Sequence, residues 1–334
     1  LDFLVFFAIV VSIYWRLTHR WQNVLLLGAS YVFYGWVHPW FLILIAASTI
    51  VDYAMALAME RWPRRRGAFL GISLASNLGM LGFFKYFNFF VDNVVALAGG
   101  VGLELSRPVL SIVLPVGISF YTFQTLSYTI DVYRGQLAAR KSLLDVALFV
   151  AFFPQLVAGP IERAATLLPQ VERERTFPVR LARDACLLLL WGFFKKLVVA
   201  DNVGVVANKV FGLEDPGFFV LWAGVFAFGM QIYADFSAYS DIARGTARLF
   251  GVELMRNFDH PYLALNPVDF WRRWHISLST WFRDYVYIPC GGGRGGWWRR
   301  SRNLLITFLL SGLWHGASWN YVIWGLYHGV LVVG

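Results

Sequence analysis

Charged residues are scarce in this sequence. Asp, Glu, Lys and Arg make up 15% of the 334 residues, whereas a soluble domain holds about a quarter. Hydrophobic residues reach 58% and aromatic residues 18%, and Trp and Tyr favour membrane interfaces. This composition excludes an ordinary soluble domain and predicts a membrane protein.

Cysteine is also scarce, with Cys186 inside an apolar run and Cys290 in a glycine-rich loop. Two residues without metal-ligand spacing form neither a disulfide framework nor a metal site, so we expect no bound metal. The loop at 291–296 lacks the Gly-Lys-Ser/Thr ending of a P-loop, and we interpret it as a hinge. No basic segment precedes the first apolar run, so we expect no signal peptide.

Acidic residues are fewer than basic ones, which leaves a net charge of +9. Such a balance fits nucleic acid, acidic lipid or an anionic substrate. In a membrane protein, however, Lys and Arg collect in cytoplasmic loops. We therefore expect contacts with membrane lipids and no nucleic-acid partner.

Apolar segments recur along the whole chain, and a spanning helix needs about 20 apolar residues. Pro154 and the Gly159-Pro160 pair interrupt one segment, which we expect to be re-entrant because lipid cannot satisfy a broken backbone. The sequence therefore predicts an all-α, multi-pass membrane protein with one domain over residues 1–334, truncated at both ends. The candidate segments are 1–15, 22–37, 40–58, 68–98, 109–130, 142–158, 184–211, 218–236, 303–316 and 319–334.

Basic residues in the loops orient these segments. Clusters within 16–20, 61–66 and 134–141 are separated by two crossings each, which places all three on the cytoplasmic side. The basic region 240–302 joins them if 142–158 turns back instead of crossing. Segment 161–183 mixes Glu and Arg, and we expect a solvated cytoplasmic hairpin there.

Residues 266–285 have the pattern of one amphipathic helix at the cytoplasmic interface. Asn266 suits the N-cap, Pro267 the first helical position and Asp269 the first turn. His275 borders an aromatic stripe, either as a packing residue or as a catalytic one. The stripe recurs at steps of three and four residues and comprises Trp271, Trp274, Leu278, Trp281 and Tyr285.

His315 gives a sharper signal. If a helix runs from Arg302, the thirteen-residue step to His315 spans about 20 Å. That step places the imidazole past the middle of a hydrocarbon core about 30 Å thick. An ionisable residue at such depth is a functional candidate. Gly312 and Gly316 form a small-xxx-small pair, which lets another helix approach closely.

A further polar group lies in apolar surroundings. Its members either line a tunnel or form a structural hydrogen-bond network, and the sequence leaves both interpretations open. They are Lys195, Lys196, Asp235, Ser237, Tyr239, Ser240 and Asp241.

Several motifs resemble those of the membrane-bound O-acyltransferases, and most closely those of the bacterial alginate O-acetyltransferase branch. The two histidine motifs are Phe270–Tyr285 and Ser311–Gly316. Further stretches match in the order found in the family, and together the motifs cover most of the chain. They are Leu114–Phe123, Phe153–Ile161, Phe194–Lys196 and Asp235–Asp241.

The resemblance implies a ring of tilted helices in the bacterial inner membrane, with His315 as the essential histidine and His275 as the second. It implies no bound cofactor. We expect a cytosolic acyl thioester such as acetyl-CoA to donate its acyl group to a hydroxyl outside, with Arg273, Trp274 and Trp314 as candidate tunnel residues. The acceptor belongs to exopolysaccharide acetylation, with a periplasmic acetyltransferase of the SGNH type as partner.

Two other functions remain open at this stage. A transporter also uses broken helices and buried polar groups, although the sequence shows no inverted repeat. A non-catalytic scaffold for periplasmic acetyltransferases would need neither histidine, so substitution of His315 separates these functions.

Overall fold

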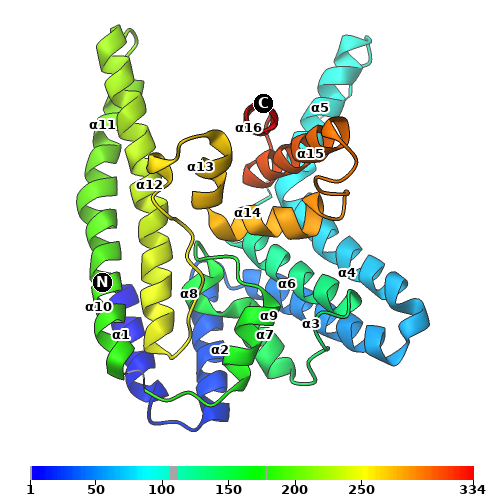
Figure 1. Cartoon of the computed structure of the whole chain (residues 1–334), viewed down its shortest axis with the longest axis vertical. Coiled ribbons are helices and arrows are strands. Elements are labelled where there is room, and N and C mark those ends of the chain that lie inside the picture. Colours follow the sequence, from blue (N-terminus) through cyan, green and yellow to red (C-terminus); the bar gives the residue numbers. More distant parts are fainter. Residues whose placement is uncertain (1, 106–111, 178) are drawn as a thin grey trace.

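A computed structural model of the chain describes residues 2–105, 112–177 and 179–334 (Figure 1). Within these ranges the chain is α-helical and contains no strand, which confirms the predicted all-α class. Leu1 of the predicted span 1–15, residues 109–111 of the predicted span 109–130 and Pro178 of the predicted hairpin lie outside the described residues.

The first half of the chain holds nine α-helices in its described part. They are α1 (Asp2–Tyr14), α2 (His19–Gly35), α3 (Phe41–Arg61), α4 (Arg66–Leu81), α5 (Phe87–Gly100), α6 (Ile118–Tyr133), α7 (Leu143–Ala151), α8 (Phe153–Leu156) and α9 (Ala164–Glu172). Residues Pro63–Arg65 form a short 3-10 turn, η1, before α4, and the π-helical turn η2 (Gly82–Tyr86) joins α4 to α5.

The second half begins with two long helical arms that lie side by side in Figure 1. Its helices are α10 (Val179–Phe194), α11 (Asp201–Phe211), α12 (Phe218–Leu249), α13 (Pro267–Arg273), α14 (Ile276–Phe282), α15 (Trp297–His315) and α16 (Trp319–Val333). The π-helical turn η3 (Lys195–Ala200) joins α10 to α11, η5 (Arg283–Tyr287) follows α14, and the 3-10 turn η4 (Pro261–Leu263) precedes α13.

Three helical stretches of the described chain are long and apolar enough to cross a membrane. They are Phe41–Arg61, Pro63–Gly100 and Phe218–Leu249, with mean hydropathies of 2.0, 1.5 and 1.4. On the last of these, Phe219 is 84% exposed and Phe226 is 72% exposed. Water disfavours such an apolar surface, whereas lipid does not. The helices therefore support the predicted membrane protein.

The predicted segments correspond to helices whose ends differ from the predicted ones. α6 begins only at Ile118, after Gly117 in a left-handed conformation (φ 78°). α12 continues to Leu249 and α15 begins at Trp297, because charged residues at these helix ends obscured the apolar pattern. The predicted interruption of 142–158 is observed, since Phe152 separates α7 from α8.

Several segments that are far apart in the sequence are joined near the ends of α1, α3, α6, α9 and α12. The contacts join Tyr14 to Phe250 O (2.9 Å), Gln170 to Glu253 O (3.0 Å), Ala139 N to Glu60 Oε1 (2.6 Å) and Arg140 to Glu172. The loops around 16–20, 61–66 and 134–141, which the arginine pattern assigns to one side, are therefore linked through a shared network.

The predicted solvated hairpin at 161–183 is wrong for two of its charged residues. Glu162 is 1% exposed and Arg175 is 9% exposed, because the apolar face of α9 packs into the core and carries them inward. Arg175 donates a hydrogen bond to Asn23 Oδ1 and lies over the Tyr14 ring. Met255 N donates to Glu162, yet burial raises the pKa of the Glu162 carboxyl to about 7.

Candidate active site

Residues 266–285 form two short helices, so the predicted single helix is wrong. Asn266 caps α13 as predicted, with Oδ1 accepting a hydrogen bond from Asp269 N at 2.8 Å. α13 ends at Arg273, and His275 takes a left-handed conformation (φ 43°, ψ 56°) that leads into α14. Residues other than glycine rarely adopt this conformation. The aromatic stripe is therefore divided at His275.

Asn257 holds the turn at His275. Ile276 N donates to Asn257 O (2.9 Å) and Ser277 N donates to Asn257 Oδ1 (3.1 Å). Nδ2 of Asn257 donates in turn to Ser240 Oγ of α12 at 3.2 Å. These contacts offset the cost of the left-handed residue, which is about 1–3 kcal/mol. They anchor the turn between α13 and α14 to α12.

The imidazole of His275 is buried, with 1% of the residue exposed. Its centroid lies 4.6 Å from the Phe236 ring and 5.9 Å from the Trp314 ring. Neither ring nitrogen has a hydrogen-bond partner within the described part of the chain. Most buried polar atoms have one, so both nitrogens are available to a reacting group.

His315 ends α15, and the preceding turn lies tightly against α16. A Cβ atom at Gly312 would overlap Tyr321 O, and one at Gly316 would overlap the Tyr321 ring. The predicted close approach of another helix at this glycine pair is confirmed. The His315 imidazole meets the Trp324 ring at 5.0 Å, so α16 forms one wall of the site.

Trp314 lies between the two histidines. Its ring centroid is 5.9 Å from that of His275 and 5.0 Å from that of His315. The residue is 6% exposed, and its Nε1 donates to Ser119 O at 3.4 Å. Phe123, also on α6, stacks on it at 5.6 Å. The two predicted histidines, from separate motifs, therefore meet around one fixed indole.

Lys85 was not among the predicted site residues. It lies in η2, and its Nζ donates to Trp314 O and to Ser119 Oγ (3.0 Å). The neighbouring Tyr86 hydroxyl donates to Leu313 O at 2.5 Å. The last carbonyls of a helix lack partners within it, so these side chains cap α15. A cation inside the predicted apolar span 68–98 is a sequence signal that could have identified it.

A narrow cavity of about 220 Å³ separates α13 and α14 from α15. Neither histidine lines it, but Trp271 and Ser279 of the first histidine motif and Ser311 of the second do. Each serine lies four residues, or about one helical turn, from a site histidine. Most of its wall is apolar. Arg272 supplies positive charge, whereas Arg283 is paired with Asp284 at 2.7 Å. A thin apolar chain with an anionic end matches such a cavity.

The other predicted site residues lie in different surroundings. Trp274 packs against Phe258 at 5.1 Å beside His275. The charged ones lie in ion pairs, two of which join α12 to η3. The contacts are Arg273–Asp269 (2.9 Å), Lys196–Asp235 (2.7 Å) and Lys195–Asp241 (2.7 Å), with Lys196 over the Tyr239 ring at 5.6 Å.

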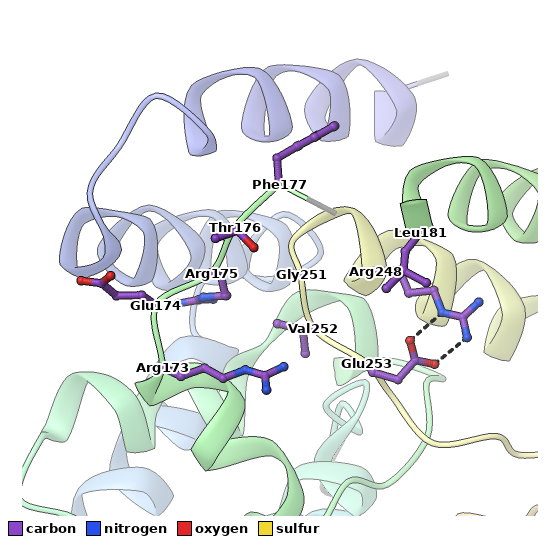
Figure 2. Close-up of a pocket in the computed structure, with 10 residues that line it drawn as sticks. All are labelled: Arg173, Glu174, Arg175, Thr176, Phe177, Leu181, Arg248, Gly251, Val252 and Glu253. Carbon is purple, nitrogen blue, oxygen red and sulfur yellow. Dashed lines mark hydrogen bonds and ion pairs between the residues drawn. The ribbon is translucent and has the colours of Figure 1, made fainter. Parts of the chain in front are cut away.

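A cavity of about 740 Å³ lies at the end of α12, and neither histidine lines it. Figure 2 shows three arginines around it, of which Arg173 points toward Glu253. Arg248 donates two hydrogen bonds of 2.6 Å to Glu253, and Arg175 is held by Asn23. No residue of the two histidine motifs lines this cavity, so it does not mark the catalytic site.

A model of the membrane-bound O-acyltransferase family matches residues 136–334, which include both histidines. The chain belongs to this family. Membership confirms the resemblance given by the motifs and, with the apolar helices, identifies a membrane protein.

Curated relatives extend the match over nearly the whole chain. The chain is 44% identical over 331 residues to the probable alginate O-acetylase AlgI of Pseudomonas putida, which is 98% of this chain and 67% of that protein. It is 43% identical over 336 residues to the probable alginate O-acetylase AlgI of Pseudomonas aeruginosa, which is 98% of this chain and 63% of that protein. The peptidoglycan O-acetyltransferase of Helicobacter pylori is 35% identical over 333 residues, which is 90% of this chain and 62% of that protein. The chain thus spans 62% to 67% of the length of these family members.

Proposed function

We propose that this chain carries the catalytic centre of an O-acyltransferase, which moves an acetyl group from a cytosolic thioester to a hydroxyl acceptor. The observation that carries the proposal is the meeting of His275 and His315 around Trp314. A narrow apolar cavity lined by Ser279 and Ser311, four residues from each histidine, supports it. The names of the alginate and peptidoglycan relatives support acetyl as the group transferred.

Acyl transfer needs a base that accepts the proton of the attacking hydroxyl. His315 takes this proton while the hydroxyl oxygen bonds to the acyl carbon. The bond from carbon to sulfur then breaks, and the proton passes from the imidazole to the departing thiolate. His275 binds the reacting groups from the other side of Trp314, because its ring nitrogens are otherwise without partners in the described chain.

The donor in this proposal is acetyl-CoA or another acyl thioester, and no cofactor stays bound. The cavity between α14 and α15 accepts the thin thioester arm, with Ser279 and Ser311 along its length. Arg272 on the cavity wall attracts the anionic end of the donor. Trp274 and Arg273 precede His275 directly and border this approach. Asp235, Tyr239 and Asp241 support it through the pairing of α12 with η3.

The acceptor in this proposal is an alginate-like exopolysaccharide, reached through a periplasmic acetyltransferase of the SGNH type. Donor and acceptor lie on opposite sides of the bacterial inner membrane. The helices cross it several times as a ring around the site, and the segment 142–158 is re-entrant. The break at Phe152 and the linked basic loops support this arrangement.

The test is the acetyl content of the exopolysaccharide in cells that produce His315→Ala at wild-type membrane levels. We expect acetylation to be lost. His38→Ala is the matched control, since His38 is exposed in the loop between α2 and α3 and should leave acetylation unchanged. Normal acetylation with His315→Ala would remove this residue from the mechanism and favour a transporter or a scaffold.

A further inference from the structure

We propose that Lys85 is a second catalytic group of this site, and that its ammonium stabilises the negative charge that develops on the acyl oxygen during transfer. The inference rests on the proposed acyltransferase function, and it adds a residue that neither histidine motif contains.

The position of Lys85 follows from η2. The π-helical turn directs Lys85 and Tyr86 together toward the end of α15. Nζ of Lys85 bonds the carbonyl of Trp314, the residue that precedes His315, and lies 5.5 Å from the Trp314 ring centroid. The ammonium is therefore fixed beside the indole that separates the two imidazoles.

The charge of Lys85 has no carboxylate partner in the described chain. An ammonium carries three N–H donors, and Trp314 O and Ser119 Oγ occupy two of them. A cation inside an apolar span is costly, and its usual place is at a functional site. The third donor is available to a ligand that approaches His315.

Capping of α15 does not by itself explain a charged residue. Tyr86 caps the neighbouring carbonyl of Leu313 with a neutral hydroxyl. A neutral donor at position 85 would satisfy Trp314 O at a lower desolvation cost. The charge therefore requires a second role, and the chemistry of the site supplies one.

That role arises when the hydroxyl oxygen bonds to the acyl carbon and the carbonyl electron pair moves onto the acyl oxygen. The ammonium donates a hydrogen bond to this oxygen and keeps its proton. When the carbonyl reforms, the sulfur leaves with its electron pair and receives the hydroxyl proton through His315. Removal of one such donor typically lowers the rate about 100-fold or more.

The experiment follows labelled acetate into exopolysaccharide in cells that produce the full-length protein. Lys85→Gln keeps two N–H donors for the cap but loses the charge, whereas Lys85→Arg keeps the charge. Tyr86→Phe removes the neutral cap beside it. Membrane levels and the melting temperature in detergent confirm that each variant is folded. We expect Lys85→Gln to lower the initial rate about 100-fold, Lys85→Arg to retain a substantial rate, and Tyr86→Phe to remain near wild type.

A wild-type rate for Lys85→Gln would overturn the inference. Equal losses for Lys85→Gln and Lys85→Arg would also overturn it, because cap geometry and not charge would then matter. His315→Ala serves as the reference for the proposed function. If His315→Ala incorporates acetate as fast as wild type, the proposed acyltransferase function is wrong. If His315→Ala loses incorporation but Lys85→Gln does not, only the role of Lys85 is wrong.

Discussion

Glu162 shows what burial does to a single residue of this protein. Its carboxyl is enclosed between α9 and the segment that follows α12, and burial raises its pKa from 4.5 to about 7. The folded state therefore binds a proton that the unfolded state releases. The stability contributed by this proton is complete below about pH 4.5 and is lost as the pH rises through 7.

Glu162→Gln should remove this dependence, because the amide keeps an acceptor for Met255 N without a charge. We expect the variant to melt at a higher temperature than wild type at pH 8 and at the same temperature at pH 4.5. A shift from 4.5 to about 7 corresponds to at most about 3 kcal/mol. Thermal unfolding in detergent at both pH values measures the difference. Glu174→Gln, at an exposed carboxylate, is the control, and an equal gain there would contradict the assignment to Glu162.

The sequence identified both histidines of the site because each lies in a motif with a recognisable pattern. It did not predict the left-handed backbone of His275, since Asn257 and Ser240 impose that conformation from other segments. Lys85 was missed for a related reason. Its partners, Ser119 and Trp314, become neighbours only in the folded chain.

Among the elements, the pair α15 and α16 depends most directly on small residues. The small-xxx-small pattern at Gly312 predicted this contact from the sequence alone. The existence of the apolar helices was also predictable from the sequence, since each contains a long run of hydrophobic residues. The break between α13 and α14 was not, because the aromatic stripe continues through it at helical spacing.

Gly312→Ala should separate α15 from α16 and displace His315. The added methyl would overlap Tyr321 O, and overpacking of this kind costs about 1–3 kcal/mol. We expect a lower melting temperature and reduced acetylation. Gly71→Ala in α4 is the matched change, because nothing lies within 4 Å of the added Cβ there. Equal effects of the two substitutions would show that helix propensity, and not helix contact, limits the site.

At the scale of the whole molecule, the turn between α1 and α2 lies at one end and the turn between α11 and α12 lies at the opposite end (Figure 1). The arginine pattern assigns the first end to the cytoplasm. Glu214 lies in the opposite turn and is exposed. The two ends should therefore differ in access from outside the cell.

Single cysteines test this orientation after Cys186 and Cys290, both exposed, are changed to serine. A membrane-impermeant maleimide should label Glu214→Cys in intact spheroplasts. It should label Arg20→Cys and Arg64→Cys only after the membrane is opened. Labelling of Arg20→Cys and Arg64→Cys from opposite sides would refute the shared cytoplasmic face.

The π-helical turn η2 also changes the phase of the helix that contains it. Each residue advances an α-helix by about 100°, so the extra residue of a π turn rotates everything beyond it by about that angle. α4 buries Ser73, Asn77 and Leu81, whereas α5, on the other side of η2, buries no residue. Deletion of one residue in η2 would restore a continuous α-helical phase and rotate Lys85 and α5 away from their present positions. The π-helical turn that interrupts the helix is therefore also the element that brings a charge to the histidines.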